Sequence, residues 1–147
     1  MNGKERKTAR CSGIDYNAGG TFFVTFCTEN MSCILSVVEP ETNAVRKTEI
    51  GGYVDEAIRF IDKDGVHVHE YVIMPNHVHM LIGLDEGVDV CGIVGRIKSY
   101  STKCAGKRIW QRSFHDHKVR DRRDGDEIRR YIVQNPLKWS LDRYYSE

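Results

Sequence analysis

All six histidines of the chain occur in three His-x-His pairs: His67/His69, His77/His79 and His115/His117. Side chains two residues apart on a β-strand point to the same side of a sheet, so a pair on a strand presents two imidazoles together. Neutral imidazole is a common ligand of divalent metals. The spacing therefore indicates candidate metal sites, and the residues around each pair distinguish among them.

The pair His77/His79 lies in the segment PNHVHMLIGL. On a strand, Val78, Met80 and Ile82 would form the opposite, apolar face and would pack on a core. We expect the histidine face to be half open. An isolated His-x-His on a strand is a weak indication of a metal, because a metal site also needs a third ligand.

The other two pairs favour different roles. On a regular strand, the next residues on the face of His67 and His69 would be Tyr71 and Ile73. That pattern favours a sheet face whose imidazoles are satisfied by hydrogen bonds. The third pair lies among basic residues, which suits contact with phosphate or a structural hydrogen bond better than metal binding.

A candidate third ligand and a candidate nucleophile occur together in RRYIVQNP. Tyr131 and Asn135 are four residues apart and share one face of a helix, and Gln134 shares it approximately. The flanking residues Arg129 and Arg130 are basic. Alone, the segment is typical of a surface tyrosine before a helix end, but with a histidine pair it would supply a nucleophile and an amide ligand.

The composition is that of one globular domain, which we place over residues 1–147. Apolar residues make up 40% and charged residues 29% of the 147, as in ordinary soluble proteins. No apolar run approaches the roughly 20 residues of a membrane span, and the N-terminal MNGKERKTAR has no apolar signal region. The five cysteines are scattered without a Cys-x-x-Cys, which indicates a reducing cytoplasm.

The net charge of +1 conceals an asymmetry. Residues 1–95 carry 8 Lys/Arg and 14 Asp/Glu, a net −6, whereas residues 96–147 carry 14 and 7, a net +7. A basic half on a nearly neutral protein favours a surface that contacts a polyanion such as nucleic acid. Solvent-exposed helices that contact no polyanion would give the same asymmetry of charge.

Residue patterns predict an α+β fold. Strands are expected over 21–28, 32–39, 66–74 and 76–84, with a strand or extended loop over 109–121. Helices are expected over 51–65, 88–108 and 124–139, the last ending near Asn135 because Pro136 disfavours helical geometry in the residue before it. This order predicts a ferredoxin-like or RRM-like antiparallel sheet with helices on one face and an appended C-terminal helix carrying Tyr131.

Three segments in order, VIMPNHVHMLI, WQRSFHDHKVR and YIVQNPLKW, resemble the REP-associated tyrosine transposases. These proteins belong to the single-tyrosine HUH (His-hydrophobe-His) transposases and nucleases, which include the IS200-like transposases. DYNAGGTFFVTFCTEN also resembles the opening strand of the family. The resemblance covers residues 10–142, and the pairing of MPNHVH with a distal YIxxNPxKW is highly specific.

The resemblance implies roles for individual residues. His77 and His79 match the HUH histidines, Tyr131 matches the catalytic tyrosine, and Asn135 matches the third metal ligand, with Gln134 as the alternative. The implied catalytic set is therefore Tyr131, His77, His79 and Asn135. The implied cofactor is Mg²⁺ or Mn²⁺, and neutral imidazoles suit Mn²⁺ better.

The family cleaves and rejoins single-stranded DNA at hairpins through a 5′-phosphotyrosine. The expected partner is single-stranded or hairpin DNA, and the expected setting is a prokaryotic cytoplasm, close to the nucleoid. A homodimer stays open, because relatives in the wider class are dimers whereas members of this branch can be monomers. The side chains expected to contact DNA are Arg96, Lys98, Lys103, Arg112, His117, Arg120, Arg122, Arg123, Arg129 and Arg130.

Two other functions compete with strand transfer. Nucleotide hydrolases of the histidine-triad type need a third histidine where this chain has Leu81, which argues against that enzyme class. A domesticated protein that binds hairpin DNA without cutting it would keep the same fold. Retention of the four candidate catalytic residues argues against that second alternative.

Overall fold

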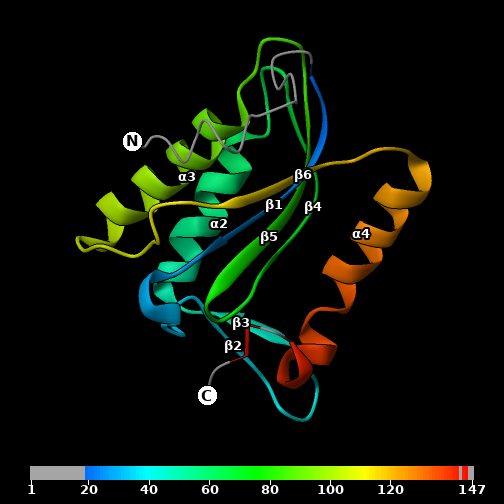
Figure 1. The fold of residues 1–147 in the computed structure, drawn as a ribbon. Helices are drawn as coiled ribbons and strands as arrows, with labels where there is room; N and C mark the ends of the chain where they lie inside the picture. The colour runs from blue at the N-terminus through cyan, green and yellow to red at the C-terminus, as the bar shows by residue number, and fades with distance from the viewer. Residues whose placement is uncertain (1–18, 143, 146–147) are drawn as a thin grey trace.

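The computed structural model describes residues 19–142, 144 and 145, so the start of the predicted core at residues 10–18 lies outside the described residues. Its main feature is a four-stranded antiparallel sheet in the order β4-β5-β1-β6 (Figure 1). The strands are β1 (Gly20–Cys27), β4 (Val66–Ile73), β5 (His77–Leu84) and β6 (His115–Lys118). With the helix between β1 and β4 and the helix between β5 and β6, this is the predicted ferredoxin-like βαββαβ arrangement.

Helices α2 (Glu49–Ile61) and α3 (Val90–Ala105) pack together on one side of the sheet (Figure 1). The Thr48 side chain caps α2 by accepting a hydrogen bond from the Gly51 N–H, and Asp89 caps α3 in the same way. A Cβ at Gly51 would lie 2.0 Å from the Leu35 carbonyl oxygen, so only glycine fits this approach. The apolar residues of both helices meet the even-numbered side chains of β5 in the main core: Val54, Ile58, Ile61, Ile93, Val94, Ile97, Val78, Met80 and Ile82.

Helix α4 (Arg122–Gln134) covers the opposite side of the sheet (Figure 1). Ile128 and Ile132 pack on Leu81 there, in a second and smaller apolar cluster. The helix ends where Pro136 predicts, and a short 3-10 helix, η3 (Pro136–Leu141), follows it. In the part of the chain that the structure describes, the layers are thus α2 with α3, then the sheet, and then α4.

This arrangement corrects one expectation from the sequence. The histidine face of β5 was predicted to be half open, and this is wrong, because α4 and the segment after it cover that face. His77 and His79 are 0% and 1% exposed. Every residue of β5 is buried, which is the expected environment of a strand lying between two neighbours and two layers of helix.

The prediction of a strand over residues 32–39 is mostly wrong. Only β2 (Ser36–Val38) is strand, and it pairs with β3 (Val45–Lys47) in a separate two-stranded sheet. A turn at residues 40–42 lies between them, and Asn43 follows it at φ 61°. Leu35 is buried in the main core, which explains why an apolar segment continues here without a longer strand.

Strand β4 contains a bulge that the sequence pattern does not indicate. Val68 pairs with Ile82, but Glu70 pairs with Leu81, so His69 is an extra residue. The bulge reverses the alternation, and Tyr71 therefore lies on the α2 side, where its hydroxyl donates to Asp55 at 2.5 Å. The expectation that Tyr71 and Ile73 share a face with His69 is wrong for this reason.

Candidate active site

The histidines His77 and His79 lie side by side on the face of β5 that α4 covers. Their ring centroids are 4.6 Å apart. Because β5 lies between β1 and β4, and its backbone is hydrogen-bonded to both, the two imidazoles project from a strand that is held on both edges. The strand geometry expected from the His-x-His spacing is confirmed.

Each histidine is oriented through its Nδ1 atom. His77 Nδ1 lies 2.8 Å from Asn76 Oδ1, and His79 Nδ1 lies 2.7 Å from Thr25 Oγ1. Asn76 donates through Nδ2 to the Tyr144 carbonyl at 2.7 Å, so its Oδ1 atom faces His77 and must accept. His77 therefore carries its proton on Nδ1 and presents an Nε2 lone pair, as a metal ligand does.

Burial keeps the His77 imidazole neutral. Loss of solvation lowers the pKa of His77 from its ordinary 6.5 to about 4, against a smaller opposing effect of the Asn135 side chain. At neutral pH the Nε2 atom of His77 is a free base rather than a charged donor. That atom is buried and has no hydrogen-bond partner among the described residues.

Tyr131 and Asn135 approach the pair from the end of α4. The ring centroid of Tyr131 lies 5.2 Å from that of His79, and Tyr131 is 42% exposed. Asn135 is 2% exposed and donates through Nδ2 to the Tyr131 carbonyl at 3.3 Å. The Oδ1 atom of Asn135 is buried without a hydrogen-bond partner among the described residues. Helical spacing thus brings a phenol and an amide to the same site.

These donors fit a divalent metal. A buried polar atom without a hydrogen-bond partner costs about 1–3 kcal/mol. Among the described residues, the Nε2 atom of His77 and the Oδ1 atom of Asn135 are such atoms, and both lie at this site. An ion held between them would satisfy both. Imidazole nitrogen with amide oxygen is a donor set suited to Mn²⁺, and to Mg²⁺ when more oxygen ligands are added.

The segment after α4 completes the walls of the site. The ring centroid of Tyr144 lies 4.4 Å from that of His77, and that of Trp139 lies 6.1 Å away. A cavity of about 240 Å³ lies beside Tyr131, lined also by Gln134, Asn135, Lys138, Leu141 and Asp142. Sequence reasoning missed Thr25 and Asn76, which no local pattern marks, and it missed Asp142.

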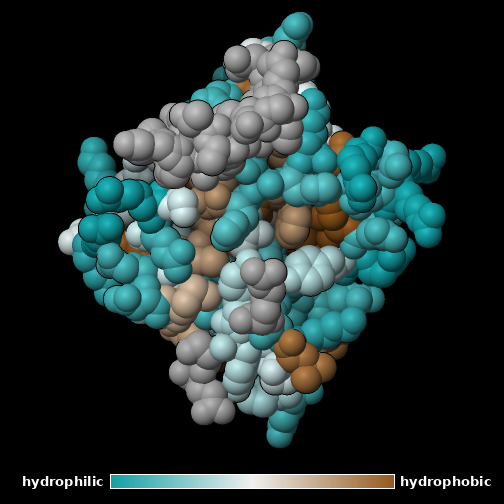
Figure 2. Space-filling model, viewed as in Figure 1, coloured by the Kyte–Doolittle hydropathy of each residue, from teal (hydrophilic) through white to brown (hydrophobic). Residues whose placement is uncertain are grey.

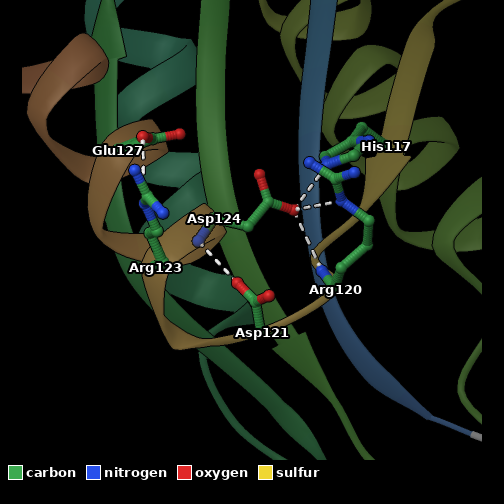
Figure 3. A network of polar contacts seen from close by, with 6 residues as sticks. All are labelled: His117, Arg120, Asp121, Arg123, Asp124 and Glu127. Carbon is green, nitrogen blue, oxygen red and sulfur yellow. Dashed lines mark hydrogen bonds and ion pairs between the residues drawn. The ribbon is translucent and has the colours of Figure 1, made fainter.

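The start of α4 is tied to the sheet by a polar network (Figure 3). Asp124 accepts hydrogen bonds from His117 Nε2 at 2.8 Å and from the Arg120 main-chain N–H at 3.0 Å. Asp121 accepts from the Asp124 N–H at 2.9 Å and caps the helix. The pKa of Asp124 falls to about 2, chiefly through the Arg120 main-chain bond and then through His117. His117 thus has the structural hydrogen bond that the sequence suggested for its pair.

The remaining pair does not join the site. His67 lies 3.2 Å from Asp85 across an exposed surface. His69 lines a different cavity of about 360 Å³, with Leu81 from β5 and with Arg120, Arg122 and Arg129 from the α4 side of the sheet.

The predicted DNA-contacting residues are divided between the two sides of the sheet. Arg96, Lys98 and Lys103 belong to α3, whereas Arg122, Arg123, Arg129 and Arg130 belong to α4, on the side of Tyr131. Both helices present a largely hydrophilic surface in Figure 2, with hydrophobic side chains reaching the surface between the sheet and α4. Lys98 donates to the carbonyls of Gln111 and Ser113, both at 2.9 Å, and thereby holds the loop that carries Arg112.

Comparison with known proteins identifies the family of the chain. The model of the family described as "Transposase IS200 like" matches residues 36–135, which include His77, His79, Tyr131 and Asn135. The chain belongs to the IS200-like transposase family. The match runs from β2 to the end of α4 and does not include β1.

Two relatives match most of the chain. A REP-associated tyrosine transposase of Escherichia coli is 28% identical over 126 residues, covering 84% of this chain and 70% of the relative. A Haemophilus influenzae protein described as uncharacterized is 27% identical over 169 residues, covering 95% of this chain and 93% of its own. Both relatives come from bacteria.

A solved structure extends the agreement to the fold. The structure of a REP-associated tyrosine transposase bound to a REP hairpin superimposes with a TM-score of 0.67 at 29% identity, covering 82% of this chain and 68% of that chain. The α+β fold predicted from the sequence is thereby confirmed. Within the described residues, no helix combines the length and apolar character needed to span a membrane.

Proposed function

We propose that this IS200-like family member is a metal-dependent endonuclease and transposase that cleaves and rejoins single-stranded DNA at REP-like hairpins. The observation that supports this most strongly is the convergence of Tyr131, Asn135 and the two β5 histidines from separate elements onto one buried site. The hairpin as substrate rests on the relative whose structure contains one.

Tyr131 is the proposed nucleophile. Its Oη atom would attack the scissile phosphorus, forming a 5′-phosphotyrosine as the bond to the 3′ oxygen breaks. The tyrosine proton is lost and the departing oxygen gains one, which leaves a free 3′-OH. The phosphotyrosine conserves the energy of the phosphodiester, so the reverse attack by a 3′-OH rejoins DNA without ATP.

The residues around Tyr131 would position the phosphate. His77, His79 and Asn135 would hold Mg²⁺ or Mn²⁺, and this ion, when bound, polarises a non-bridging phosphate oxygen. Lys138 lines the cavity beside Tyr131 and supplies a positive charge there. Exposure of the Tyr131 ring leaves it accessible to DNA from that cavity.

A phosphotyrosine trap tests this function. The chain is incubated with Mn²⁺ and 3′-labelled single-stranded oligonucleotides from REP-like hairpins beside its own gene, and the products are run on a denaturing gel. A labelled protein band that is lost in Tyr131→Phe, while hairpin binding on a native gel stays, is the expected result. The alternative, a domesticated hairpin-binding protein, predicts a salt-sensitive native shift and no covalent band with either protein.

A further inference from the structure

The chain after α4 folds back over the two β5 histidines and is held there on both sides of Asp142. The Asp142 N–H donates to the Trp139 carbonyl at 3.0 Å, which closes the last turn of η3. Two residues later, the Tyr144 carbonyl accepts from Asn76 Nδ2 at 2.7 Å. The Tyr144 ring packs on His77. Asp142 is therefore kept beside the histidines by its neighbours in sequence.

The Asp142 carboxylate lies within the same group of donor atoms as the two imidazoles. One ligand atom from each of His77, His79 and Asp142 lies within 4.8 Å of the other two. Ligand atoms around Mg²⁺ are about 3 Å apart when adjacent and about 4.2 Å apart when opposite, since its bonds are about 2.1 Å long. Small side-chain rotations would bring these atoms to one ion.

We propose that Asp142 is a further ligand of the metal, so that the site is two imidazoles, one amide and one carboxylate. This inference rests on the metal site of the proposed function and adds a ligand from outside the tyrosine helix. A carboxylate is the ligand that hard cations such as Mg²⁺ and Mn²⁺ prefer, whereas imidazoles and an amide alone carry no charge. Asp142 supplies the negative charge that the other three donors lack.

Four protein ligands leave two positions of an octahedral ion open. A phosphate oxygen and a water could then complete the coordination, which would be sufficient for the proposed chemistry. Asp142 is half-buried and lines the same cavity as Tyr131, so its carboxylate lies on the side of the site from which DNA would reach the tyrosine.

Asp142 also has a local structural role that the test must separate from metal binding. Its Oδ1 atom accepts a hydrogen bond from the Tyr144 N–H at 2.8 Å. Asn at this position keeps an Oδ1 acceptor and the same shape but loses the charge. Asp142→Asn therefore retains the turn and weakens only the ligand. Asp126→Asn, at an exposed position of α4 on the other cavity, removes an equal charge as the matched control.

The experiment measures Mn²⁺ binding directly, by the electron paramagnetic resonance signal of free Mn²⁺ titrated with chelator-treated protein. We expect Asp142→Asn to raise the Mn²⁺ Kd at least about tenfold. Removing a group that only hydrogen-bonds to a metal ligand already lowers metal affinity about 10–100-fold. Asp126→Asn should bind as the native chain does, and His77→Ala should lose the site. The metal-free Tm of Asp142→Asn should match the native value, and its rise on adding Mn²⁺ should be smaller.

The outcomes separate this inference from the function on which it rests. An unchanged Kd in Asp142→Asn, with binding lost in His77→Ala, overturns the Asp142 assignment and leaves the histidine site intact. If Asp126→Asn weakens Mn²⁺ binding equally, the assignment is also overturned, because the loss of a negative charge elsewhere on the protein would then explain the effect. Binding that survives His77→Ala overturns the metal site and the Asp142 ligand together. A failed phosphotyrosine trap, with the Asp142 effect present, contradicts strand cleavage alone.

Discussion

Thr25 and His79 are directly paired across β1 and β5, with Thr25 Oγ1 2.7 Å from His79 Nδ1. The contact is buried and fixes the orientation of the imidazole that lies next to Tyr131. Hydrogen bonds of this kind set the tautomer and ring angle of a metal-binding histidine.

Thr25→Val tests that relationship. The substitution keeps the branched shape on the strand but removes the hydroxyl, so we expect Mn²⁺ affinity to fall about 10–100-fold. A buried polar atom deprived of its partner should also lower the free energy of unfolding by about 1–3 kcal/mol. Thr25→Ser keeps the hydroxyl and should retain most of the affinity. If Val and Ser behave alike in the Mn²⁺ titration, the hydroxyl does not orient His79.

The network at the start of α4 predicts a pH dependence of stability. The folded-state pKa of Asp124 is about 2, below its ordinary 3.8. A depressed pKa means that this stabilisation is complete above the unfolded-state pKa and is lost as the pH falls through the folded one. The unfolding free energy of the native chain should therefore exceed that of Asp124→Asn by a constant amount above about pH 5, and the difference should shrink from pH 4 to pH 2.

Urea unfolding at a series of pH values measures this difference. Asp126→Asn is the control, because Asp126 is exposed and belongs to the same helix. Its difference from the native chain should show no comparable change over the same pH range. A difference for Asp124→Asn that stays constant down to pH 2 would contradict the network.

The histidine pairs of β5 and β4 should behave differently when they are substituted. His77→Ala and His79→Ala should abolish cleavage and weaken Mn²⁺ binding, because both imidazoles belong to the buried site. His67→Ala and His69→Ala should retain both properties and change the free energy of unfolding by less than about 0.5 kcal/mol, as exposed substitutions do. Loss of cleavage in His67→Ala equal to that in His77→Ala would mean that the wrong pair has been chosen.

The division of basic residues predicts that one side of the sheet contributes most to DNA binding. Arg122 and Arg129 line one cavity on the side of Tyr131, whereas Arg96 and Lys103 are on α3. The double variant Arg122→Ala/Arg129→Ala should lower the slope of log K against log salt by about 0.7–0.9 for each phosphate that the protein no longer neutralises. Arg96→Ala/Lys103→Ala removes the same charge and should leave the slope near the native value. Equal reductions would show that DNA reaches both sides.

Much of the architecture follows from local patterns. The β-branched and aromatic run at 21–28, the alternation in 76–84 and the Pro136 stop each depend on a few neighbouring residues, and all three predictions agree with the structure. The shared face of His77 and His79 depends only on strand geometry. Helical spacing likewise places Tyr131 and Asn135 together before any tertiary contact is considered.

The supporting contacts could not be predicted in the same way. Thr25 is 54 residues from His79 in sequence, and the Asn76 bond to Tyr144 spans 68 residues. Such pairs depend on strand order and on the path of the chain after α4, which no local pattern encodes. The burial of the histidine face was missed for the same reason, because it depends on which side of the sheet α4 occupies.

The bulge at His69 divides β4 into two halves, and the side chains that face α4 have odd numbers in one half and even numbers in the other. Before it, odd-numbered side chains face α4, and after it, even-numbered ones do, so Val72 rather than Tyr71 packs in the apolar cluster beside Leu81. Deleting His69 would remove the bulge without turning its neighbours, because Val68 and Glu70 would then follow one another and alternate regularly against Ile82 and Leu81. A one-residue deletion between Glu70 and Ile73 would instead turn part of the strand to the wrong face, because side-chain direction reverses at every residue of a regular strand. His69 is therefore a position at which β4 can lose a residue and still present Val72 to α4.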